Sequence, residues 1–87
     1  MSLEFRLEPF NVEDKEDIVE RFGFWIERLE CYFIDRDVKD DAKRINTFKM
    51  VSGDGIMKLY HAMEGSKVTT YEELVQKFKD TYMHMYI

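Results

Sequence analysis

Cysteine, proline and long apolar runs are nearly absent from this sequence. Its 87 residues include one cysteine, Cys31, one proline and two histidines. These numbers exclude an internal disulfide and a zinc site made of four Cys and His ligands. The lone thiol is typical of a reducing compartment, so we expect an intracellular, cytoplasmic protein. No segment approaches the roughly 20 apolar residues that a transmembrane helix needs, so we expect no membrane partner.

Positive charge is also in short supply. Lys and Arg number 13 against 18 Asp and Glu, which gives a net charge of −5. Binding to a phosphate backbone requires a surplus of cations on one face of a protein. We therefore expect no direct nucleic-acid partner for this chain.

Groups that could perform chemistry are few and scattered. His61 and His84 lie beside aromatic residues in separate segments, where we expect surface or partly buried structural roles, and Cys31 is expected to be a buried or half-buried inert thiol. The acidic loop after Ile34 does not match a calcium-binding EF-hand, because Asp40 stands where glycine is needed and Asn46 where glutamate is needed. We expect no catalytic residue, no metal ligand and no cofactor, and hence no enzyme.

Aromatic residues, in contrast, are abundant and follow a helical spacing. Seven Phe, five Tyr and one Trp stand in a chain that is 45% hydrophobic, which suits a small domain with a single core. The stretch from Phe22 to Phe33 repeats apolar residues every three or four positions, the pattern of an amphipathic helix. We predict a first helix from Glu13 or Lys15 to Phe33 or Ile34.

Three more helices follow at the same periodicity. Asp40 or Asp41 is expected to cap the second, which carries Ala42, Ile45 and Phe48. Two glycines, in the segment 52–55, are expected to end it. The third helix is expected to hold residues 56–63 and to end at a glycine, Gly65.

The last helix is expected to open with a capping box, Thr70-x-x-Glu73. Before the first helix, residues 1–11 alternate apolar and polar and then meet Pro9, which predicts an extended arm. The sequence therefore predicts an all-α fold, a bundle of four or five helices over residues 12–87 behind an arm at 1–11. The expected core consists of Ile18, Phe22, Trp25, Ile26, Leu29, Phe33, Ile45, Phe48, Leu59, Leu74 and Phe78.

The order of these features resembles the N-terminal capsid lobe of Gag proteins from Ty3/gypsy-type retrotransposons, and the domesticated Arc-like proteins related to them. The resemblance rests on Pro9-Phe10, on the run WIERLECYF at 25–33, on DDAKR at 40–44 and on TYEEL at 70–74. It covers nearly the whole chain. The segment 52–63 departs from the family pattern, because two glycines stand where the family often has an alanine-rich turn.

The resemblance implies a retroviral-capsid-like lobe that self-assembles and belongs to a longer protein. It also implies an alternative, a monomeric domesticated adaptor that binds extended hydrophobic peptides in a groove. Both need apolar side chains outside the core, for which the candidates are Phe5, Leu7, Phe10, Phe24, Tyr86 and Ile87. The arm is expected either to fold back over its own bundle or to lie in a neighbour's groove.

Overall fold

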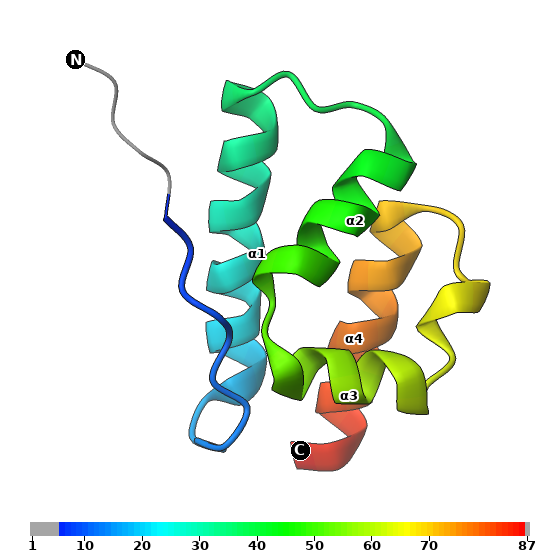
Figure 1. The fold of residues 1–87 in the computed structure, drawn as a ribbon. Helices are drawn as coiled ribbons and strands as arrows, with labels where there is room; N and C mark the ends of the chain where they lie inside the picture. Colours follow the sequence, from blue (N-terminus) through cyan, green and yellow to red (C-terminus); the bar gives the residue numbers. More distant parts are fainter. Residues whose placement is uncertain (1–5, 87) are drawn as a thin grey trace.

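The computed structural model describes residues 6–86, apart from the side chain of Tyr86. These residues form helices α1 (Ile18–Asp35), α2 (Asp41–Val51), α3 (Asp54–Ala62) and α4 (Tyr71–Tyr86), with a short 3-10 turn, η1 (Gly65–Lys67), before α4. The prediction of an all-α bundle is confirmed (Figure 1). None of the described helices is long and apolar enough to cross a membrane.

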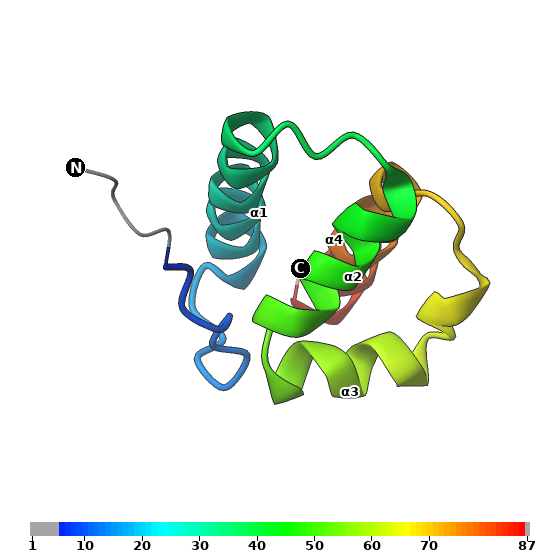
Figure 2. The same cartoon turned by 45° about the horizontal axis from the view of Figure 1, so that its top comes forward.

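Helix α4 is the central element of the bundle. It packs against α1, to which it runs antiparallel, and against α2. Helix α3 lies across one end of the bundle, and the arm runs beside α1 to the junction of α2 and α3, where Phe10 also meets Tyr82 of α4 (Figures 1 and 2). This arrangement leaves one long side of α1 facing α4 and another facing the arm.

The core is aromatic and continuous. Every residue expected there is buried except Ile45 and Leu59, which are half-buried and pack against it. Phe22 lies near its centre, with ring centroids 5.7 Å from Phe78 and 5.4 Å from Tyr82. Ala42, expected on the inner face of α2, is exposed.

Helix α1 begins at Ile18, later than the predicted start at Glu13 or Lys15. The side chain of Asn11 accepts a hydrogen bond from the Glu13 N–H, and that of Asp14 accepts one from the Glu16 N–H. Such local turns compete with helix formation, which the charge pattern alone did not reveal. Asp17, in a left-handed conformation with φ 51°, separates these turns from the helix.

The other helix ends follow the prediction more closely. Asp40 caps α2 by accepting a hydrogen bond from the Lys43 N–H at 3.0 Å, and Thr70 accepts one from the Glu73 N–H at 3.2 Å. The end of α3 differs, because the left-handed residue there is Glu64 rather than Gly65. Gly65 is buried and serves close packing, since a Cβ atom at this position would overlap the ring of Tyr60.

Candidate functional site

Phe10, predicted as part of an exposed interaction surface, is a core residue. Only 7% of it is exposed, and its ring lies 5.4 Å from that of Phe22 and 6.3 Å from that of Trp25. The prediction of an exposed Phe10 is therefore wrong. Sequence periodicity could not show this, because residue 10 lies outside any helix and its burial depends on how the arm folds back.

The described part of the arm docks on its own bundle through backbone hydrogen bonds. The Phe10 N–H donates to the Ser52 carbonyl oxygen at 3.1 Å, and the Trp25 indole N–H donates to the Glu8 carbonyl oxygen at 2.7 Å. Of the two behaviours expected for the arm, the structure therefore shows folding back onto the chain's own groove.

Two glycines shape the groove that receives the arm. A Cβ atom at Gly53 would lie 2.7 Å from the Cβ of Pro9, and one at Gly55 would overlap the side chain of Val12. Gly53 also has φ 91°, a conformation that other residues rarely adopt. The glycine pair that was expected to break the second helix thus also makes room for the arm.

Arg21 of α1 fastens the loop between the arm and α1. Its guanidinium donates to the carbonyl oxygens of Asn11, Asp14 and Glu16, and it lies over the Phe10 ring at 5.2 Å from the centroid. This contact network fixes the arm relative to α1. A hollow of about 340 Å³ remains beside the arm, lined in part by Leu7, Phe24 and Arg28.

The exposed apolar residues are distributed over α1, α2 and α4. Leu7 is half-buried against the core, whereas Phe24 is 57% exposed. Phe5 and Ile87 lie outside the described residues, as does the side chain of Tyr86. Sequence analysis missed other exposed residues, among them Ile34, Met50, Met83 and Met85.

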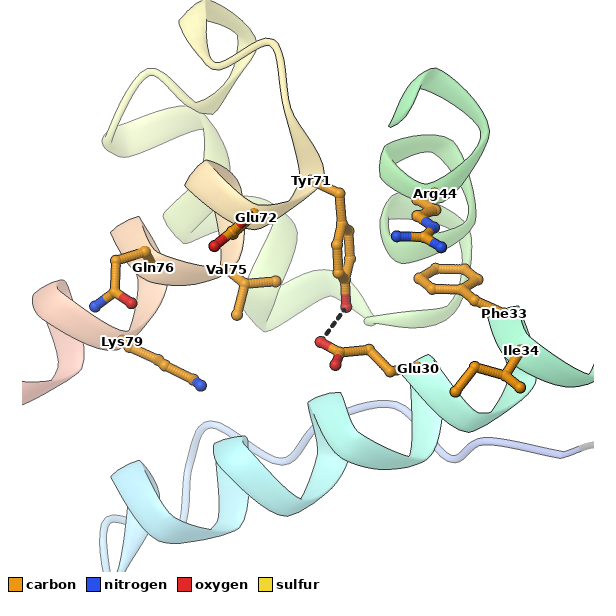
Figure 3. Close-up of a pocket in the computed structure, with 9 residues that line it drawn as sticks. All are labelled: Glu30, Phe33, Ile34, Arg44, Tyr71, Glu72, Val75, Gln76 and Lys79. Carbon is orange, nitrogen blue, oxygen red and sulfur yellow. Dashed lines mark hydrogen bonds between the residues drawn. The ribbon is translucent and has the colours of Figure 1, made fainter. Parts of the chain in front are cut away.

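A separate cleft of about 460 Å³ opens between α1, α2 and the first turns of α4 (Figure 3). Phe33 and Val75, both buried core residues, lie among its lining, and Glu30, Arg44 and Tyr71 contribute polar groups. A shallower hollow of about 570 Å³ adjoins it and shares Arg44 and Tyr71. Sequence analysis did not predict this cleft, because its walls come from three helices whose packing the periodicity does not specify.

The polar groups of the cleft are engaged in structural contacts. The Tyr71 hydroxyl donates to Glu30 Oε2 at 3.3 Å, while Arg44 donates from Nε to the Val38 carbonyl oxygen at 2.8 Å and lies over the Phe33 ring. Burial, together with the Glu30 carboxylate, raises the pKa of the Tyr71 phenol far above its ordinary value. Tyr71 therefore stays neutral and acts as a hydrogen-bond donor near neutral pH.

The candidate reactive groups are not collected in this cleft. His61 on α3 and His84 on α4 are exposed, and neither belongs to its lining. Cys31 is exposed on α1, so the prediction of a buried or half-buried thiol is wrong. Within residues 6–86, no three His, Cys, Asp or Glu side chains are grouped so that they could hold a metal ion.

Comparison of the chain with protein-family models, with curated proteins and with solved structures finds no match.

Proposed function

We propose that this chain is a non-catalytic protein-interaction domain that self-associates, in the manner of the N-terminal capsid lobe of a Ty3/gypsy-type Gag protein. The order of sequence motifs supports the assignment to this type, and the all-α fold is compatible with it. An active retroelement and a domesticated descendant would both use such a domain.

The observation that carries the proposal is the number of large apolar side chains left in solvent. Phe24, Ile34, Met50, Met83 and Met85 are between 49% and 80% exposed, whereas core residues such as Phe22, Phe48 and Phe78 are fully buried. Contacts made by a few exposed side chains are individually weak, and an assembly becomes stable by repeating them over many copies.

Sedimentation equilibrium tests self-association directly. We expect the mean mass to rise with protein concentration between about 10 µM and about 1 mM, the range of weak association. A chain that remains monomeric over that whole range would overturn the proposal of self-association.

The groove under the arm favours a second candidate function, the capture of an extended hydrophobic peptide. Gly53 and Gly55 leave room there for an extended segment, and Pro9, Phe10 and Val12 of the same chain fill it. A chain that lacks residues 1–12 would offer this groove to a peptide from another protein.

Fluorescence can test peptide capture, because the groove contains the only tryptophan of the chain, Trp25. Adding a synthetic peptide of residues 6–12 to the chain that lacks residues 1–12 is expected to change the emission of Trp25 in a saturable manner. The matched control is the same peptide with alanine at Phe10. Equal responses to both peptides would rule out specific capture in this groove.

A further inference from the structure

The hollow beside the arm carries positive charge on a chain that is negative as a whole. Among the described residues, the cations that line it are Arg6 of the arm and Arg21 and Arg28 of α1, and the one carboxylate is that of Glu8. The net charge of the chain is −5. The hollow is therefore a local exception, and its charge favours an anionic partner over a cationic one.

Arg28 is the cation of the hollow that is available to a partner. It is exposed, and within residues 6–86 its guanidinium makes no hydrogen bond or ion pair. Arg21, in contrast, already donates to main-chain carbonyl oxygens at the end of the arm. Arg28 follows Trp25 by three positions and Arg21 precedes it by four, so Arg28 lies farther from the acidic loop 13–17. A carboxylate of a partner would therefore be held at Arg28.

An exposed aromatic ring stands beside this cation. Phe24 is 57% exposed, and it follows Arg21 by three positions and precedes Arg28 by four, so the three side chains share one face of α1. Leu7, which is half-buried, lines the hollow from the arm. An apolar wall next to a cation suits a partner that carries an apolar side chain next to a carboxylate.

The arm also contributes main-chain groups to the hollow. The Glu8 carbonyl oxygen and the Phe10 N–H are hydrogen-bonded to the bundle. Leu7 and Pro9 line the hollow, and within residues 6–86 the Leu7 N–H and the carbonyl oxygens of both residues have no hydrogen bond. Main-chain donors and acceptors of this kind are what an extended peptide pairs with when it docks along a strand-like segment.

We propose that this hollow is a docking site for an extended segment of a partner protein in which carboxylates stand next to an apolar residue. A carboxylate of the segment pairs with Arg28, the apolar side chain packs on Phe24 and Leu7, and the main chain of the segment pairs with that of Leu7. The site differs from the groove under the arm, because Phe10 and Val12 occupy that groove and the arm itself forms one wall of the hollow. It does not depend on the proposed self-association.

A nucleic acid, the other class of anion that binds arginine and aromatic side chains, is a poorer match to the hollow. Its phosphates repeat along the whole backbone, so a strand seated on Arg28 would also pass Glu8 and the acidic loop 13–17. A short acidic peptide can place its charge at one end alone. The main chain of Leu7, moreover, has its natural complement in the amide groups of a peptide.

Fluorescence anisotropy with a labelled peptide tests the chemistry of the partner. The probe is fluorescein-labelled Ser-Glu-Asp-Phe-Thr-Leu-Thr, and its matched control is Ser-Gln-Asn-Phe-Thr-Leu-Thr, which lacks the carboxylates. We expect the full chain to bind the acidic peptide with a dissociation constant of about 10 to about 100 µM, and the neutral peptide at least about fivefold more weakly. Equal binding of the two peptides would overturn the proposal, as would tighter binding of a labelled single-stranded oligonucleotide.

Substitutions at exposed positions of the chain locate the site. Arg28→Gln and Phe24→Ala are each expected to raise the dissociation constant of the acidic peptide at least about fivefold. The matched control, Lys58→Gln on α3, removes one positive charge outside the hollow and is expected to leave the dissociation constant within about twofold of the original. If Lys58→Gln weakened binding as much as Arg28→Gln, the attraction would come from the charge of the whole chain and the hollow would be wrong as the site.

The emission of Trp25 distinguishes docking beside the arm from displacement of the arm. Trp25 lines the hollow and is the only tryptophan of the chain, and the unlabelled acidic peptide has none. Docking in the hollow keeps the arm in place, so the emission maximum is expected to stay where it is or to move to shorter wavelength. A move to longer wavelength, the effect expected when the arm is removed, would mean that the peptide replaces the arm and would overturn the proposal.

Discussion

At the scale of single residues, the presence or absence of one side chain determines how closely segments approach. Gly53 and Gly55 let the arm lie against the start of α3, and Gly65 lets the chain pass over Tyr60. With the arm in this position, the ring of Phe10 lies in the core. Removal of a ring from such a position leaves a cavity, whereas removal of an exposed ring does not.

Phe10→Ala is accordingly expected to lower the free energy of unfolding by about 3 kcal/mol, as for other buried aromatic residues. Phe24→Ala removes a phenyl ring from an exposed position on α1 and is expected to change the free energy of unfolding by less than about 0.5 kcal/mol. Urea unfolding followed by circular dichroism, at a concentration where the chain is monomeric, measures both. Equal losses for the two variants would contradict the placement of Phe10 in the core.

Tyr71 is expected to make the protein less stable at high pH. Burial and, secondarily, the Glu30 carboxylate raise the pKa of its phenol above the ordinary 10.0, so the folded chain holds the proton after the unfolded chain has released it. The contribution of the Tyr71 phenol to the free energy of unfolding is therefore fully present below about pH 10. Above about pH 10 it is lost, by up to about 1.4 kcal/mol per pH unit. Urea unfolding between about pH 8 and about pH 11 should show a shallower decline for Tyr71→Phe. If the free energy of unfolding fell equally with pH in the original chain and in Tyr71→Phe, the proposed role of the Tyr71 phenol would be wrong.

At the scale of helices, capping side chains connect elements as well as ending them. Asp40 caps its own helix, α2, through the Lys43 N–H. Its neighbour Asp41 instead accepts a hydrogen bond from the Tyr71 N–H, the first residue of α4, at 2.9 Å. One turn of α2 thus fixes the start of α4, next to the cleft.

Asp41→Ala is expected to destabilise the protein by about 1 kcal/mol, because it leaves an N–H group at the start of α4 without its acceptor. Asp41→Asn keeps an oxygen in the same place and is expected to lose less than half of that amount. Amide hydrogen exchange would show the loss as faster exchange in the first turn of α4. Uniform protection of α4 in Asp41→Ala would mean that this contact does not hold the helix start.

At the scale of the whole molecule, the arm completes a bundle that four helices leave open. The described arm covers Trp25 and the side of α1 that carries Arg21 and Phe24. Another side of α1, which carries Glu30 and Ile34, borders the cleft. The two surfaces share no residue, so the arm can be removed without touching the cleft.

Deletion of residues 1–12 is expected to shift the emission of Trp25 to longer wavelength and to lower the free energy of unfolding by at least about 3 kcal/mol, since it includes the loss of Phe10. The dissociation constant for self-association should remain within about threefold of the original, because the exposed methionines Met50, Met83 and Met85 lie on α2 and α4, outside the arm. If the arm instead exchanged between copies, its deletion would raise the dissociation constant by much more than threefold.

The helical periodicity predicted the fold class, the number of helices and most of the core, because each amphipathic stripe already specifies which side of its helix is buried. Residues such as Phe22, Leu29 and Phe78 are buried for this local reason. The caps at Asp40 and Thr70 were predictable for the same reason, since each depends on a few neighbouring residues.

The position of the arm, the burial of Phe10 and the cleft beside Tyr71 depended on contacts between segments far apart in sequence. The Phe10 N–H meets Ser52, and Tyr71 meets Glu30 and Asp41, and no local sequence pattern marks these pairings. The sequence by itself determined which surfaces of the helices are apolar. Only the tertiary structure decided which of those surfaces are covered, because coverage is set by the geometry of packing between distant segments.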